Sequence, residues 1–149
     1  MPTWKPVLAV TVVSLIGIWL LFPEYLDLQT APSRDEFRGL VGDRTARATS
    51  AAVADLVFTL SYATLGVILY SYVATGFVRA IGTALVVGGA VADEVENVAL
   101  ILNLQRTTPT SDGIDLMLTA GSVKWGLLSA AIILLLALAG QQWLDRRRG

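Results

Sequence analysis

The chain contains no cysteine and no histidine. Without cysteine it can form neither a disulfide nor a thiol nucleophile, and without both residue types it lacks the usual ligands of zinc, haem and copper sites. Histidine is also the one side chain that titrates near neutral pH without a perturbing environment. We therefore expect no cofactor, and any proton chemistry at neutral pH would have to use other side chains.

Charge is scarce as well. Charged residues make up 15% of the 149 residues, whereas soluble domains carry about a quarter. The formal net charge is −1, so no basic surface indicates a nucleic-acid partner. Hydrophobic residues make up 54%, the mean hydropathy is +0.64, and the apolar residues are gathered into long runs. These features predict an integral membrane protein that lies in the lipid bilayer.

Four apolar segments are long enough to cross the ~30 Å hydrocarbon core of a bilayer, which takes a helix of ~20 residues. The segments span residues 6–22, 51–73, 81–104 and 114–140. The last two connections are short, so segments two, three and four should be antiparallel neighbours. We predict one all-α transmembrane domain over residues 1–149, a four-helix bundle with up-down-up-down topology. The first segment is expected to be an uncleaved helix and not a signal peptide, because Pro32 would follow the candidate cleavage site.

The only long polar segment is the first loop, residues 24–49. Within it, the stretch from Ser33 to Glu36 matches a capping box, in which serine and glutamate satisfy free backbone donors of a helix. Phe37, Leu40 and Val41 follow at helical spacing. The pattern predicts a short interfacial helix that could cover the bundle like a lid, although an ordinary connector is the simpler alternative.

The distribution of basic residues predicts the orientation. Lysine and arginine are enriched in short cytoplasmic segments of membrane proteins. Lys5 precedes the first segment, Arg79 follows the second, and three arginines, residues 146–148, follow the fourth. The first loop also contains arginines, but acids are interleaved with them. We predict a multi-pass protein of the cell membrane with both termini in the cytoplasm.

The most informative feature is the charge inside two of the apolar segments. The third contains Asp93, Glu94, Glu96 and Asn97, and the fourth contains Lys124. A charge near the centre of a membrane helix costs at least ~2.5–3.5 kcal/mol, so such residues usually face a protein interior and serve a function. This cluster is therefore the first candidate for a functional site.

Helix geometry predicts which polar groups can meet. With a rise of ~1.5 Å per residue, Lys124, Asp93 and Tyr62 lie ~15–16 Å below the outer ends of their segments, Glu96 and Thr59 ~12 Å, and Asp55 ~6 Å. Helical spacing also places these groups on facing sides of their segments. We predict a polar, partly hydrated cavity between segments two, three and four that opens outward past Asp55. The predicted ligand- or ion-binding residues are Asp55, Thr59, Tyr62, Asp93, Glu96, Asn97 and Lys124.

The charges in the predicted site do not balance. Lys124 should pair with Glu96 or Asp93, and this pair could be purely structural. However, one lysine cannot neutralise Asp93, Glu94 and Glu96 together. At least one carboxylate should then hold a proton, bind a cation or meet a basic group of another subunit. For Asp55 a simpler role is also open, stabilisation of the first turn of its helix.

Three functions agree with this pattern. The site could bind a small ligand, a proton or a cation and transport it. Alternatively, the chain is an accessory or assembly subunit of a larger membrane complex, with structural charges. Four helices enclose only a small pocket, so under either function we expect a homo-oligomer or a larger membrane complex. The third is a membrane-embedded lipid-modifying enzyme in which Asp93 and Glu96 act as acid and base or as metal ligands, and in the latter case Asp55, Asp93 and Glu96 could hold Mg²⁺ or Ca²⁺. The sequence lacks a Gly-rich phosphate loop and the G-x-S-x-G and H-E-x-x-H motifs, which favours a non-enzymatic role.

Overall fold

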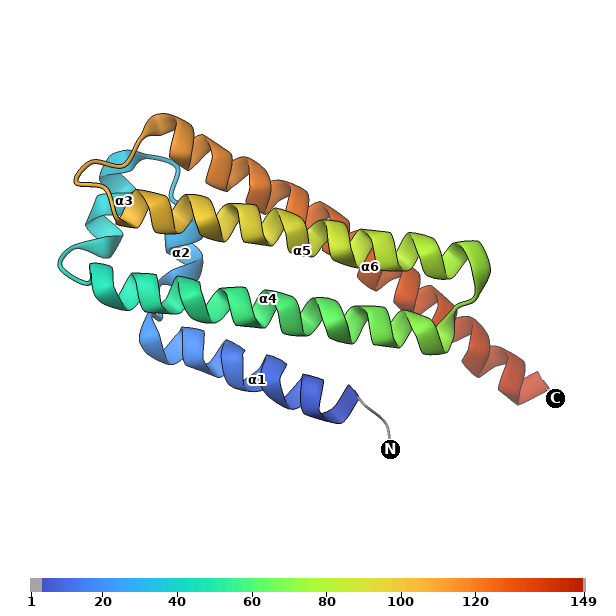
Figure 1. The fold of residues 1–149 in the computed structure, drawn as a ribbon. Helices are drawn as coiled ribbons and strands as arrows, with labels where there is room; N and C mark the ends of the chain where they lie inside the picture. Colours follow the sequence, from blue (N-terminus) through green and yellow to red (C-terminus); the bar gives the residue numbers. More distant parts are fainter. Residues whose placement is uncertain (1–3, 149) are drawn as a thin grey trace.

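The computed structural model describes residues 4–148, without the side chains of residues 146 and 148. Every regular element in this range is an α-helix, in agreement with the predicted all-α class. The helices are α1 (Trp4–Leu21), α2 (Tyr25–Gln29), α3 (Arg34–Val41), α4 (Thr45–Val73), α5 (Gly76–Leu104) and α6 (Ser111–Arg148) (Figure 1). Three stretches of the described chain are long and apolar enough to cross a membrane: Trp4–Leu21, Thr45–Val73 and Ser111–Asp145.

Helix α5 is the exception among the four long helices. It has 29 residues, as many as α4, but it is not one of the three apolar candidates for a membrane span. It also carries four charged residues, Arg79, Asp93, Glu94 and Glu96. Whether α5 can span a membrane therefore depends on whether its charged side chains face the protein interior or the lipid.

The long helices extend beyond the apolar segments from which they were predicted. Helix α4 begins at Thr45 and not at residue 51, and Ser50 within it donates a hydrogen bond to the Ala46 carbonyl at 2.9 Å. Helix α5 begins at residue 76 and not 81, and α6 continues to residue 148 and not 140. Helical hydrogen bonding does not require an apolar side chain, so a helix can continue into polar sequence outside the hydrocarbon. The start of α6 is capped by Thr110, whose Oγ1 accepts from the Gly113 N–H at 3.1 Å.

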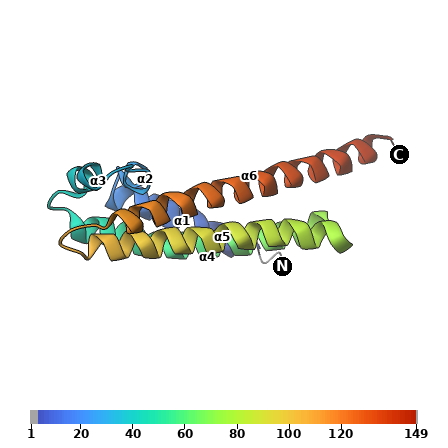
Figure 2. The same ribbon diagram turned by 90° about the horizontal axis from the view of Figure 1, so that it is seen from above.

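The first loop contains two helices where one was predicted. Ser33 caps α3 and accepts a hydrogen bond from the Glu36 N–H at 3.2 Å, which confirms the capping signal. Helix α2 was not predicted, since five residues are too few to show a helical pattern of apolar positions. Both short helices lie at one end of the molecule, on the same side of α4 and α5 as α6 (Figure 2).

Consecutive long helices run in opposite directions (Figure 1). Helix α1 packs on α4, α4 on α5, and α5 on α6, whereas α1 and α6 are not a major packing pair. The four helices therefore form a curved row and not a closed ring. Figure 2 shows α6 crossing this row obliquely and diverging from it toward the C-terminus. Helix α2 touches α6 at the end where α6 begins.

Two apolar clusters hold the row together. The larger lies at the end that contains α2 and α3, which we call the loop end, and the smaller is centred on Tyr70 nearer the opposite end. Tyr70 packs directly against Gly82 of α5, where a Cβ atom would collide with the tyrosine ring, and its hydroxyl donates to the Ala131 carbonyl of α6. This glycine is therefore required for close packing of α4, α5 and α6. Asp93, Glu94 and Glu96 of α5 and Lys124 of α6 lie between the two clusters.

Candidate functional site

The centre of the site is a buried ion-pair network between α5 and α6. Lys124 Nζ lies 3.1 Å from Asp93 Oδ1 and 2.5 Å from Glu96 Oε2. The lysine side chain is 6% exposed and each carboxylate side chain 3%. The contact with Asp93 is a hydrogen bond, whereas the contact with Glu96 is an ion pair outside hydrogen-bond geometry. The predicted buried salt bridge is thus confirmed, and Lys124 serves both acids.

Asp93 connects this ion pair to α4. Its Oδ2 accepts hydrogen bonds from the Thr59 hydroxyl at 2.7 Å and from the Tyr62 hydroxyl at 2.8 Å. Asn97, one turn further along α5, donates to Asp93 Oδ1 in a long contact of 3.5 Å. One carboxylate therefore joins three helices, and the structure brings together the residues for which the helical rise predicted a common level.

A second polar group lies beside the first and includes α2. Tyr25 Oη lies 3.1 Å from Asp55 Oδ2 and 2.9 Å from Asn97 Oδ1, so its single proton can be donated to either. Gln29 Nε2 lies 3.2 Å from Asp55 Oδ2 and 3.4 Å from Asn97 Oδ1. Burial raises the pKa of the Tyr25 phenol, and the nearby Asp55 carboxylate raises it further. The phenol therefore stays protonated and acts as a donor to these oxygens.

Tyr25 and Gln29 are functional candidates that the sequence analysis missed. Tyr25 is 3% exposed, and its hydroxyl points into the bundle. The spacing of four residues places Tyr25 and Gln29 on one face of a helix, which was the available signal. It could not be used, because nothing in the sequence marked these five residues as a helix.

The location of Asp55 corrects two expectations. It lies well inside α4, which begins at Thr45, so it does not stabilise the first turn. It is also only 6% exposed, because Tyr25 and Gln29 of α2 cover it. The expected opening of the cavity past Asp55 toward the outer surface is therefore closed by α2.

A cavity of about 470 Å³ does adjoin the network, but on a different side and with different walls. It lies between α1, α2, α4, α5 and α6, and its walls are mainly apolar, not polar as predicted. Of the predicted site residues, Asp55, Tyr62, Asp93 and Lys124 line it, together with Tyr25 and Gln29. Thr59, Glu96 and Asn97 are behind these groups and hold them in place. Helix α1 contributes only apolar wall, namely Leu15, Ile18 and Trp19.

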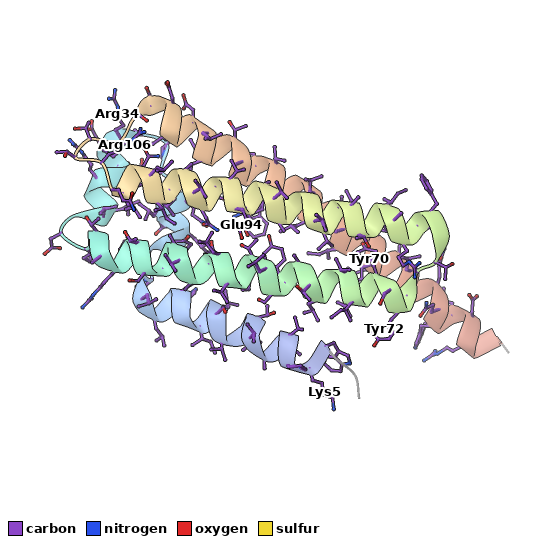
Figure 3. All side chains as sticks on the ribbon, viewed as in Figure 1. Lys5, Arg34, Tyr70, Tyr72, Glu94 and Arg106 are labelled. Carbon is purple, nitrogen blue, oxygen red and sulfur yellow. The ribbon has the colours of Figure 1, made fainter. Side chains whose placement is uncertain are left out.

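Glu94 faces away from this network. It lies in a groove of about 490 Å³ on the other side of the α4–α5 pair, walled by alanine, valine and leucine side chains. Figure 3 shows it near the middle of this pair of helices. Its Oε1 is buried and has no hydrogen-bond partner within the described part of the chain. Glu94 is therefore an acid in an apolar setting that the chain itself does not neutralise.

The carboxylates do not form a metal site. Among residues 4–148, no three acidic side chains are close enough to hold a metal ion. The Lys124 ammonium lies between Asp93 and Glu96, in the space that a metal ion shared by the two acids would need. The arrangement predicted for the enzyme alternative, with Asp55, Asp93 and Glu96 around Mg²⁺ or Ca²⁺, is thus wrong.

The chain matches no protein-family model, none of the curated proteins compared with it, and no solved structure. The function must therefore be argued from the network, the cavity beside it and the isolated acid on the opposite face.

Proposed function

We propose that all four long helices span the cell membrane. Helix α5 packs between α4 and α6, which are both apolar enough to span, and it runs antiparallel to each (Figure 1). Two of its acids, Asp93 and Glu96, are buried and paired with Lys124. Pairing and inward orientation are what make charges tolerable within a bilayer. The charges of α5 therefore do not prevent it from spanning.

We further propose that both termini lie in the cytoplasm. Lys5 and Tyr72 lie toward one end of the molecule, and Arg34 and Arg106 at the loop end (Figure 3). At the loop end, Arg44 pairs with Glu24 at 2.9 Å, and this hydrogen bond holds the pKa of the Glu24 carboxyl below its ordinary value. The orientation itself rests on the basic residues next to the ends of the long helices, Lys5, Arg79 and residues 146–148, which favour the terminal end as the cytoplasmic one.

We propose that the network is a binding site for a small ligand, a proton or a cation, with transport as the associated activity. The observation that carries this proposal is the charge balance beside a cavity. The network contains three acids, Asp55, Asp93 and Glu96, and one ammonium group, that of Lys124, which pairs with Asp93 and Glu96 only. Three of these four charged residues line a space of ligand size. A network built only for stability would not need a cavity or an acid beyond those that Lys124 can serve.

Native mass spectrometry of the protein purified from its membrane tests this proposal. We expect the parent chain to retain a non-protein molecule and Asp55→Asn to lose it, because asparagine keeps the shape of the side chain without its charge. The proposed site would be contradicted if the parent protein retained no non-protein molecule, or only molecules that Asp55→Asn retains equally well.

The alternative function is that of a subunit in a larger membrane complex or homo-oligomer, and Glu94 favours it. Its unpartnered oxygen lies in an apolar groove beside exposed valines, Val87, Val91, Val95 and Val98. A neighbouring helix that carries a hydrogen-bond donor could satisfy it. In the same mass spectra, this alternative predicts an additional protein chain that is retained by Asp55→Asn and lost by Glu94→Gln. An enzymatic role ranks third, because enzymes that act on lipid phosphates generally carry denser aspartate clusters or basic phosphate clamps than this site offers.

A further inference from the structure

We propose that the ligand of this site is a lipophilic cation, a molecule with a hydrophobic body and one positive charge that enters from the membrane between α1 and α6. This inference rests on the proposed binding function and adds the chemical class of the ligand. It follows from the charge left over in the network, the walls of the cavity and the position of its open side.

Asp55 supplies the charge that a cation would meet. Lys124 contacts Asp93 and Glu96, and no cationic group of the described chain pairs with Asp55. Its Oδ2 accepts from Tyr25 and Gln29, whereas Oδ1 accepts no hydrogen bond from any described residue. The side chain is 6% exposed and lines the cavity. A carboxylate charge is costly on a side chain that is largely buried and has no cationic partner, and a positively charged ligand would remove that cost.

The rest of the cavity fits a hydrophobic body. Beyond the polar end, its walls are aliphatic and aromatic side chains from α1, α4 and α6, among them Leu15, Leu65, Leu69, Leu128 and Leu135. On α4 the lining runs from Asp55 to Tyr70, which corresponds to ~22 Å of helix. A small hydrated cation would leave this apolar length unfilled, whereas a hydrophobic ligand would bury it.

The open side of the cavity faces the region where lipid would be. Helices α1 and α6 line the cavity without packing extensively on each other. Trp19 of α1 and Trp125 and Ile132 of α6 line it and are each more than half exposed. Since α2 covers the polar end, the gap between α1 and α6 is the route that these contacts leave. A molecule that first dissolves in the bilayer can use it.

Aromatic residues are concentrated around the same space. Three of the chain's four tyrosines and two of its four tryptophans line the cavity. Aromatic faces attract cations, most strongly where water is excluded. Lys124 makes such a cation–π contact within the protein, with Nζ 5.4 Å from the centroid of the Trp125 ring. The walls therefore suit a cationic guest better than an anionic one, which the carboxylates would also repel.

Three organic ions distinguish charge from hydrophobicity in a binding experiment. We would titrate the parent protein in phosphatidylcholine nanodiscs with tetraphenylphosphonium, with tetraphenylborate and with tetramethylammonium, and subtract binding to empty nanodiscs. The first two ions have the same shape and opposite charge, and the third has the charge without the hydrophobic body. We expect saturable binding of tetraphenylphosphonium at least about tenfold tighter than of either other ion, the difference that one charge-assisted contact produces.

Two matched pairs of variants locate the site. Asp55→Asn should weaken tetraphenylphosphonium binding by about tenfold or more, and Asp115→Asn, which changes an exposed acid of α6 outside the cavity, should not. Ile132→Trp should also weaken binding because it fills the rim, whereas Ile133→Trp changes a neighbouring exposed isoleucine that does not line the cavity.

Each other outcome overturns the inference in a recognisable way. If tetramethylammonium binds as tightly as tetraphenylphosphonium and depends on Asp55, the site binds small cations, and only the lipophilic class is wrong. If tetraphenylborate binds as tightly as tetraphenylphosphonium, the positive charge plays no part in binding. If the two variants of a pair change tetraphenylphosphonium binding equally, the ion does not bind in the cavity. If none of the three ions binds, the lipophilic cation is excluded, and the mass spectra described above decide the proposed function independently.

Discussion

Lys124→Ala is expected to destabilise the protein by about 3–5 kcal/mol, the cost of leaving a buried charge without its partner. The substitution leaves the Asp93 and Glu96 carboxylates next to each other, both almost fully buried and without a cation. Thermal unfolding in nanodiscs, followed by circular dichroism, should show a large fall in melting temperature, and the yield of folded protein should fall with it.

The chain offers both a control and a rescue for this experiment. Lys5 is its only other lysine and is exposed, so Lys5→Ala should change stability by no more than about 0.5 kcal/mol. Combining Lys124→Ala with Asp93→Asn and Glu96→Gln removes the stranded charges and should restore much of the loss. If Lys124→Ala unfolds at the temperature of the parent, the lysine is solvated and the inward-facing network is wrong.

Asp93→Leu is expected to have an effect of similar size, about 3–5 kcal/mol, because it takes from Lys124 one of its two acids. It also leaves the hydroxyls of Thr59 and Tyr62 without their shared acceptor. Asp93→Asn keeps one acceptor oxygen and the shape of the side chain, so its cost should be smaller, about 1–3 kcal/mol. The same unfolding measurement ranks the two variants.

Glu94, the acid next to Asp93, provides a matched control, because its replacement is not expected to lower stability. Glu94→Leu replaces a carboxylate that has no partner in the described chain by an apolar side chain in an apolar groove. It should leave stability unchanged or raise it in the isolated protein. Equal losses from Asp93→Leu and Glu94→Leu would show that the two acids have the same surroundings, against the network described for Asp93.

The core of the site was predictable because helix geometry is regular. The rise per residue and the number of residues per turn placed Thr59, Tyr62, Asp93 and Glu96 at the level of Lys124, and the observed contacts have this arrangement. Within a straight helix, sequence distance converts directly to height and direction. The predicted depth of Asp55 was less accurate. It was measured from residue 51, where the apolar segment begins, whereas the helix begins six residues earlier, at Thr45.

The features that depend on contacts between distant segments could not be predicted. The approach of Tyr25 and Gln29 to Asp55 depends on how the chain turns after α1, which no periodic pattern records. The gap between α1 and α6 depends on which helices pair, and hydrophobicity along one helix does not specify its neighbours. For this reason the predicted cavity was polar and bounded by three helices, whereas the observed one is mainly apolar and also bounded by α1 and α2.

The proposed intramembrane site requires that α5 crosses the membrane and that Asp93 and Glu96 lie within the bilayer. Since the chain has no cysteine, single cysteines can be introduced at the two ends of this helix by Thr75→Cys and Thr107→Cys, both at exposed positions. A membrane-impermeant thiol reagent applied to intact cells should label the Thr107 position and not the Thr75 position, and inverted membrane vesicles should give the reverse. Labelling of both positions from the same side would show that α5 does not cross the bilayer and would contradict the intramembrane site.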